Sequence, residues 1–229
     1  MKTFAASIFA ALILFVAPAA LADGNGPNTL TLTNPGTNVM GGVYVGPYTF
    51  TATTAGGQQS QALLVCDDFK DDVYVGESWQ AVTSTIPSLT NAQFSGLSQY
   101  EQVAYLTQAM FANINNPQAV ADIQWAIWDI FDPGVSSNDP YGTISAQDQI
   151  NIAGWLVDAQ TYAGSGDYAD VLLFTPLAGT QPPQYGPPQE YVTVTPEPGT
   201  LALFGIGLVA FGVIAKRRMN ASPMRQNIA

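Results

Sequence analysis

The stretch NPQAVADIQWAIWDIFDPG, residues 116–134, decides the fold. Asn116 followed by Pro117 is typical of a helix start, because asparagine caps the first turn and proline is tolerated inside it. Pro133-Gly134 is typical of a helix end. Between these signals, apolar residues stand at positions that cover nearly all sides of the helix: Val120, Ile123, Trp125, Ile127, Trp128 and Phe131. A helix that is apolar all round is normally buried, so we expect this one to lie inside the domain.

Two further helices are predicted beside this one. On its N-terminal side, Ser98 and Glu101 have the spacing of a capping box and predict a helix capped by Ser98. On its C-terminal side, a helix is expected to begin near Ser145 and to fade into Gly164-Ser-Gly166. The apolar positions are Val103, Leu106, Met110 and Phe111 in the first, and Ile150, Ile152, Trp155 and Leu156 in the second.

Short strands are predicted before and after the three helices. They are rich in β-branched and aromatic residues and are bounded by turn residues. The expected ranges are 30–33, 42–52, 62–66, 73–75 and 79–85 before the helices, and 170–175 and 190–194 after them. This order predicts an α+β fold, a β-sandwich or barrel with an inserted helical subdomain.

The first 22 residues have the pattern of a secretory signal peptide. Lys2 precedes an apolar stretch at 4–17, and Ala20-Leu21-Ala22 is a small-x-small cleavage site. We therefore expect the mature protein to begin at Asp23, with a buried core helix as the alternative explanation of the apolar stretch.

The C-terminal end has three parts in a fixed order. Pro196-Glu197-Pro198 is followed by an apolar run at 201–215 and then by Lys216-Arg217-Arg218. This ending resembles the PEP-CTERM sorting signal, with Pro196, Glu197 and Pro198 as its signature. The run is short for a bilayer-spanning helix, but snorkelling of the basic residues helps it to span.

The resemblance to the PEP-CTERM signal has implications for topology and processing. It implies a sorting signal with a transmembrane helix at 196–218 and a short cytoplasmic tail at 219–229. It also implies processing by an exosortase in a Gram-negative bacterium that makes exopolysaccharide. An ordinary C-terminal anchor is the alternative and would give the same topology. The ectodomain is then expected at 23–195.

Composition excludes several classes of function. The chain has no histidine and one cysteine, so His-dependent catalytic triads and tetrahedral Cys/His zinc sites are excluded. Residues 23–195 hold 16 of the 17 acidic residues and a single base, Lys70, for a formal charge of −15. Nucleic acid is an unexpected partner for such a surface, because phosphate binding needs clustered lysine and arginine. No carboxylate pair stands out for glycosidase chemistry, so we expect no enzyme.

An acidic turn at 67–72 is one candidate site. Asp67, Asp68, Asp71 and Asp72 stand within six residues. Carboxylates are ligands that calcium prefers, but the spacing does not match an EF-hand loop. A solvated acidic turn is therefore the main interpretation, with calcium as the alternative.

Cys66 is the second candidate. It follows apolar residues and can be a small buried hydrophobe. In an exported protein, however, an unpaired thiol is exposed to oxidation and mispairing. An intermolecular disulfide or a covalently occupied sulfur would each explain it.

The central helix and Cys66 together resemble the bacterial thioester-domain family of surface proteins. The segment Ile123 to Trp128 matches that family's helix motif at Gln124, Ala126, Ile127 and Trp128. The resemblance implies a β-sandwich with an inserted helical part and a bond between a cysteine and a glutamine, formed with loss of ammonia.

The family's other two motifs match less closely. On the cysteine side Cys66 is kept, but Asp67 stands where the family has a hydrophobe. Gln189 matches the late glutamine motif and is the expected partner, with Gln184 and Gln181 as fallback candidates.

The sequence is compatible with three functions. The first is attachment to an amine-bearing surface ligand through a Cys66–Gln189 thioester, at the cell surface or in a biofilm matrix. The second is a non-covalent structural component that binds extracellular polysaccharide or calcium. The third, an enzyme, is the one we do not expect. We favour the first, an exported adhesion protein.

Overall fold

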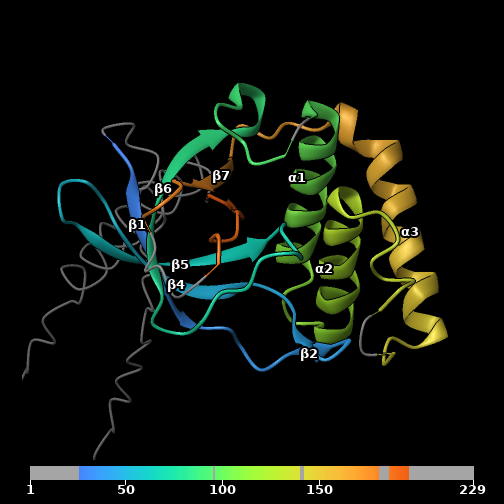
Figure 1. The fold of residues 1–229 in the computed structure, drawn as a ribbon. Helices are drawn as coiled ribbons and strands as arrows, with labels where there is room; N and C mark the ends of the chain where they lie inside the picture. The colour runs from blue at the N-terminus through green and yellow to red at the C-terminus, as the bar shows by residue number, and fades with distance from the viewer. Residues whose placement is uncertain (1–25, 95, 140–141, 181–185, 196–229) are drawn as a thin grey trace, which may run out of the picture.

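The computed structural model describes residues 26–94, 96–139, 142–180 and 186–195. It has a β-barrel on one side and three helices on the other (Figure 1). The predicted signal peptide, the sorting helix and the cytoplasmic tail lie outside the described residues. None of the helices in the described part of the chain is long and apolar enough to cross a membrane.

Six antiparallel strands close the barrel in the order β1, β4, β5, β8, β7, β6. Their bounds are β1 Asn28–Asn34, β4 Tyr48–Thr53, β5 Gln59–Cys66, β6 Ser78–Thr85, β7 Val171–Pro176 and β8 Tyr191–Val194. Of the two expected architectures, the barrel is therefore the one observed. The predicted strand at 73–75 is wrong: this short segment pairs with no strand and leads into a turn at Gly76.

Aromatic side chains fill the barrel. The Phe50 and Trp79 ring centroids are 5.8 Å apart, and those of Phe50 and Tyr191 are 4.8 Å apart. In the register of β5 and β8, Cys66 lies directly opposite Tyr191. Because directly paired residues of an antiparallel sheet share a face, Cys66 and Tyr191 lie on the same side of the barrel wall.

The helices pack as a layer against the barrel. They are α1 Leu97–Ala112, α2 Pro117–Phe131 and α3 Ala146–Tyr162, with short 3-10 turns η2 Ile86–Ser88 and η3 Ala163–Ser165. In Figure 1, α1 and α2 lie next to the barrel and α3 is on the outside. Nearly all of α2 from Val120 to Ile130 is buried, as its apolar pattern predicts.

Two of the three predicted helix starts are confirmed. The Asn116 side chain accepts a hydrogen bond from the Ala119 N–H, and Ser145 forms a capping box with Asp148. The predicted Ser98 cap is wrong, because α1 starts earlier and has Gly96 at its N-cap. Gly96 has φ +112°, which glycine adopts readily, so the chain turns into the helix before it reaches Ser98.

A small hairpin, β2 Val39–Met40 and β3 Val43–Tyr44, connects β1 to β4 and packs on α2. Its turn residue Gly41 has φ +62°, and a Cβ atom there would lie 2.3 Å from Cζ2 of Trp125. Glycine therefore lets the hairpin approach α2 closely. This contact places Gly42, Val43 and Tyr44 beside the barrel end that carries Cys66.

Candidate functional site

Cys66 is the last residue of β5 and is fully buried. Its Sγ donates a hydrogen bond to the backbone oxygen of Asp68, 3.0 Å away. This contact fixes the direction of the thiol.

Gln189 stands just before β8 and contacts the same carbonyl. Its Nε2 donates to the Asp68 oxygen at 3.0 Å and also to the Asp71 oxygen, while its Oε1 accepts from the Tyr191 hydroxyl at 2.7 Å. Since Sγ of Cys66 and Nε2 of Gln189 both lie 3.0 Å from one oxygen, they are at most twice that distance apart. The structure thus brings together the two residues that the thioester resemblance pairs.

The fallback candidates Gln181 and Gln184 lie outside the described residues. Gln189 is 9% exposed, whereas Cys66 is 0% exposed. The amide can therefore be approached from outside more readily than the sulfur.

The Cys66 thiol is neutral in this environment. Burial raises the pKa of the thiol well above its ordinary value, and the nearby acids Asp67 and Asp68 raise it further. A reaction of this sulfur consequently starts from the thiol and must move its proton.

The residues of the helix motif support the cysteine strand. Nε2 of Gln124 donates to the backbone oxygen of Cys66 at 2.7 Å, and Gln124 is fully buried. Ala126 is also fully buried, and the nearly buried Trp128 contacts Phe69, with ring centroids 5.1 Å apart. Gln124 thus ties α2 to the end of β5.

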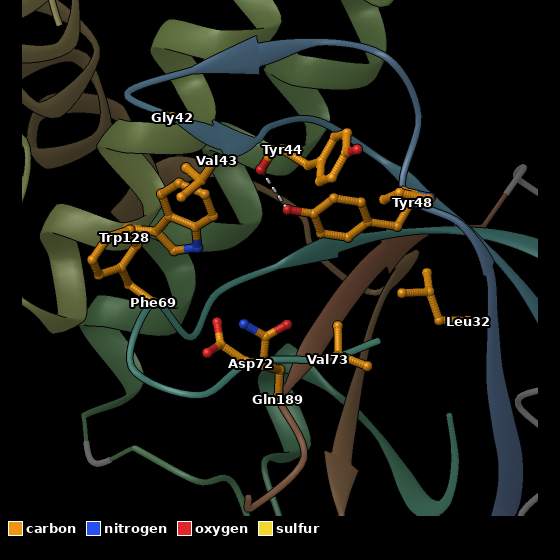
Figure 2. Close-up of a pocket in the computed structure, with 11 residues that line it drawn as sticks. Leu32, Gly42, Val43, Tyr44, Tyr48, Phe69, Asp72, Val73, Trp128 and Gln189 are labelled. Atoms are coloured by element: carbon orange, nitrogen blue, oxygen red, sulfur yellow. Dashed lines mark hydrogen bonds between the residues drawn. The ribbon is translucent and has the colours of Figure 1, made fainter. Parts of the chain in front are cut away.

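A cavity of about 230 Å³ opens beside the Gln189 amide. Its lining is mainly aromatic and apolar, with one carboxylate: Leu32, Pro35, Gly42, Val43, Tyr44, Tyr48, Phe69, Asp72, Val73, Trp128 and Gln189. Figure 2 shows Gln189 and Asp72 on one side of it and the two tyrosines opposite. Cys66 is not among the described residues that line the cavity, whereas Gln189 is.

The acids of the turn have different surroundings. Asp68 accepts hydrogen bonds from the Lys70 N–H and from Nε2 of Gln93. Asp67 is buried, whereas Asp72 lines the cavity. Within the described ranges, no group of three or more His, Cys, Asp or Glu side chains is placed to hold a metal ion. Asp68 is buried as well, so the prediction of a solvated turn is wrong for these two side chains, and the calcium alternative stays a prediction.

Asp67 and Glu190 form a buried acid pair that sequence reasoning missed. Burial and then the charge of Glu190 raise the pKa of Asp67 well above its ordinary value. The pKa of Glu190 is also raised by burial, but hydrogen bonds from Thr175 and Tyr100 oppose the rise. The Asp67 oxygens have no hydrogen-bond partner among the described residues, and burial beside the Glu190 carboxylate favours the neutral form of Asp67.

The Asp71 carboxyl makes the stability of the native state depend on pH. Burial, followed by the charge of Asp68, raises the pKa of Asp71 from 3.8 to about 6. The native state therefore binds this proton more tightly than the unfolded state, and stability is highest below the ordinary pKa. As the pH rises from about 4 to about 6, the melting temperature should fall, and Asp71→Asn should reduce this slope. A slope unchanged in Asp71→Asn would contradict the assignment.

Comparison with known proteins confirms the sorting signal seen in the sequence. Residues 194–218 match the PEP-CTERM protein-sorting motif. The motif implies export and sorting at a membrane. No curated protein matches the chain.

Two solved structures similar to the chain are bacterial thioester domains. One is the N-terminal thioester domain of a surface protein from Clostridium perfringens, with 10% identity and a TM-score of 0.38, covering 73% of this chain and 97% of that one. The other is the N-terminal thioester domain of the fibronectin-binding protein SfbI from Streptococcus pyogenes, with 13% identity and a TM-score of 0.41, covering 77% and 97%.

Proposed function

We propose that this chain is a surface-sorted attachment protein that carries an internal thioester between Sγ of Cys66 and Cδ of Gln189. The observation that carries the proposal is the shared hydrogen-bond acceptor: the thiol and the amide nitrogen both lie 3.0 Å from the Asp68 oxygen. Two buried groups held this close react far more readily than the same groups in solution.

The bond forms by acyl transfer within the barrel end. Sγ of Cys66 attacks Cδ of Gln189, the bond from Cδ to Nε2 breaks, and the thiol proton leaves with the nitrogen as ammonia. The carbonyl oxygens of Asp68 and Asp71 already accept hydrogen bonds from that nitrogen, so they stabilise positive charge as it becomes protonated. Burial of Cys66 keeps water from the product.

The cavity beside Gln189 supplies the route for a ligand amine. A protonated amine is attracted by the exposed carboxylate of Asp72 and by the faces of Tyr44 and Trp128. Once deprotonated, it attacks Cδ, forms an amide with the Gln189 side chain and releases the Cys66 thiol. This is one covalent event without turnover, so we propose no enzymatic activity.

The two ends of the chain fit this function. After export, the sorting motif at 194–218 would bring the domain to an exosortase at the membrane. Display at the cell surface or release into an exopolysaccharide matrix would then place the thioester next to amine-bearing ligands.

Intact mass spectrometry tests the proposal. The freshly purified full-length chain should be lighter by one ammonia than the mass calculated from the ends that it carries. Incubation with methylamine should add one methylamine to that lighter mass and release one alkylatable thiol. A full calculated mass together with a free thiol before any treatment would overturn the proposed function.

A second candidate is non-covalent binding of polysaccharide. It is favoured by a hollow of about 370 Å³ between α2 and α3, in which the partly exposed Trp155 lies with Asn116, Asn151 and Asp158. An aromatic face beside amide and carboxylate groups suits a sugar ring. The mass experiment separates the two candidates, because sugar binding leaves the mass of the chain unchanged.

A further inference from the structure

We propose that the Tyr191 hydroxyl is the hydrogen-bond donor that stabilises the oxyanion when the Gln189 carbonyl is attacked. The inference rests on the proposed thioester and assigns a catalytic residue to its formation and opening. It is carried by the hydrogen bond of 2.7 Å from the Tyr191 hydroxyl to Oε1 of Gln189.

The orientation of the Gln189 amide is fixed by its partners. Nε2 faces the carbonyl oxygens of Asp68 and Asp71, which only accept hydrogen bonds. Oε1 faces the Tyr191 hydroxyl, which can donate. A flipped amide would set its oxygen against two carbonyl oxygens, so the hydroxyl meets the carbonyl and not the nitrogen.

The Tyr191 side chain is equally well fixed. It is fully buried, and its ring packs against Phe50 and Tyr48, with centroid separations of 4.8 and 6.0 Å. Strand pairing places it opposite Cys66, and Gln189 precedes it by two residues. The hydroxyl, thiol and amide therefore meet on one face of the barrel end, on a scaffold that needs no rearrangement. Burial also raises the pKa of Tyr191, so it keeps its proton.

Charge develops on the same oxygen in both directions of the chemistry. When Cys66 attacks, the electron pair of the carbonyl moves to Oε1, and it returns when ammonia leaves. When an amine attacks the thioester, the pair moves to Oε1 again and returns as the thiolate leaves and takes the amine proton. Tyr191 donates a hydrogen bond throughout and retains its own proton.

Tyr191→Phe in the full-length chain tests this role, because it removes one oxygen and keeps the ring. The fraction of chain that lacks ammonia after a fixed time should fall. The rate at which methylamine opens the remaining thioester should fall about 10²-fold, as for other single oxyanion donors. Tyr168→Phe is the matched control: Tyr168 is also buried, but its hydroxyl donates to the Ala163 oxygen, and Tyr168 is not among the described residues that line the cavity. Its opening rate should stay within a few-fold of wild type.

The thioester carbonyl also gives a spectroscopic signature. In protein labelled with ¹³C at the glutamine δ carbon, the thioester resonance should move upfield in Tyr191→Phe, because the hydrogen bond is lost. If this variant does not fold, the wild-type resonance tests the hydrogen bond instead. It should lie downfield of the carbonyl resonance of a model thioester in an aprotic solvent. Equal chemical shifts for the two would overturn the inference.

The two proposals fail in different ways. A wild type that never loses ammonia contradicts the thioester itself. If the wild type loses ammonia and methylamine opens the Tyr191→Phe thioester as fast as the wild-type thioester, only the role of Tyr191 is contradicted.

Discussion

Glu190→Ala should lower the free energy of unfolding by about 3 kcal/mol or more, a large part of the ~5–15 kcal/mol that holds a typical domain together. The Glu190 carboxylate receives hydrogen bonds from the Tyr100 hydroxyl at 2.5 Å, the Thr175 hydroxyl at 2.5 Å and the Gln93 N–H at 3.0 Å. These donors come from α1, β7 and the segment before α1. Removal of the carboxylate therefore leaves buried donors unpaired where the helical layer meets the barrel.

Urea unfolding of wild type and variant, followed by tryptophan fluorescence, measures this effect. Glu77→Ala is the matched control, because Glu77 is 2% exposed and accepts a hydrogen bond from the Tyr74 N–H, while its Oε1 has no partner in the described part of the chain. It should cost about 1 kcal/mol. Equal losses in the two variants would show that the Glu190 network adds nothing beyond the burial of an acid.

The helical layer could be predicted from the sequence because its signals are local. The apolar pattern of α2, its Asn116-Pro117 start and the Ser145 cap of α3 each lie within a few residues of the structure that they specify. The barrel could not be distinguished from a sandwich in this way. Closure depends on the pairing of β1 with β6, for example Leu30 with Trp79, and strand patterns do not specify long-range partners.

The candidate site could likewise be predicted only in part from the sequence. The resemblance to thioester domains selected Cys66 and Gln189, and the pairing of β5 with β8 brings them together from distant parts of the sequence. Tyr191 was missed, although its position two residues after Gln189 in a predicted strand indicates a shared face. Glu190 was missed because its partners on α1 and β7 are known only once the layers are packed.

Asp67 is where the sequence around Cys66 differs from the thioester-domain motif that it resembles. A hydrophobe is expected after the cysteine, and Asp67 is as fully buried as a hydrophobe would be. It meets this condition as a neutral acid beside Glu190, since burial raises the pKa of both groups. As a neutral acid, Asp67 can therefore occupy this buried position.

Cys66→Ala and Gln189→Ala should each abolish the covalent capture of methylamine. Both variants should have their full calculated mass, because one lacks the nucleophile and the other lacks the acyl group. They differ in the thiol: Gln189→Ala should keep a cysteine that reacts with iodoacetamide after unfolding, whereas Cys66→Ala has none. Melting temperatures of the two variants check that the fold is retained.

Gln181→Ala and Gln184→Ala are the controls that identify the acyl donor, since both glutamines lie near Gln189 in the sequence. They should lose ammonia and capture methylamine as the wild type does. Loss of capture in Gln184→Ala with retention in Gln189→Ala would keep the thioester and move it to another glutamine. The contacts of Gln189 make the opposite result the expected one, because its amide shares the Asp68 carbonyl with the Cys66 thiol and lines the cavity through which an amine must enter.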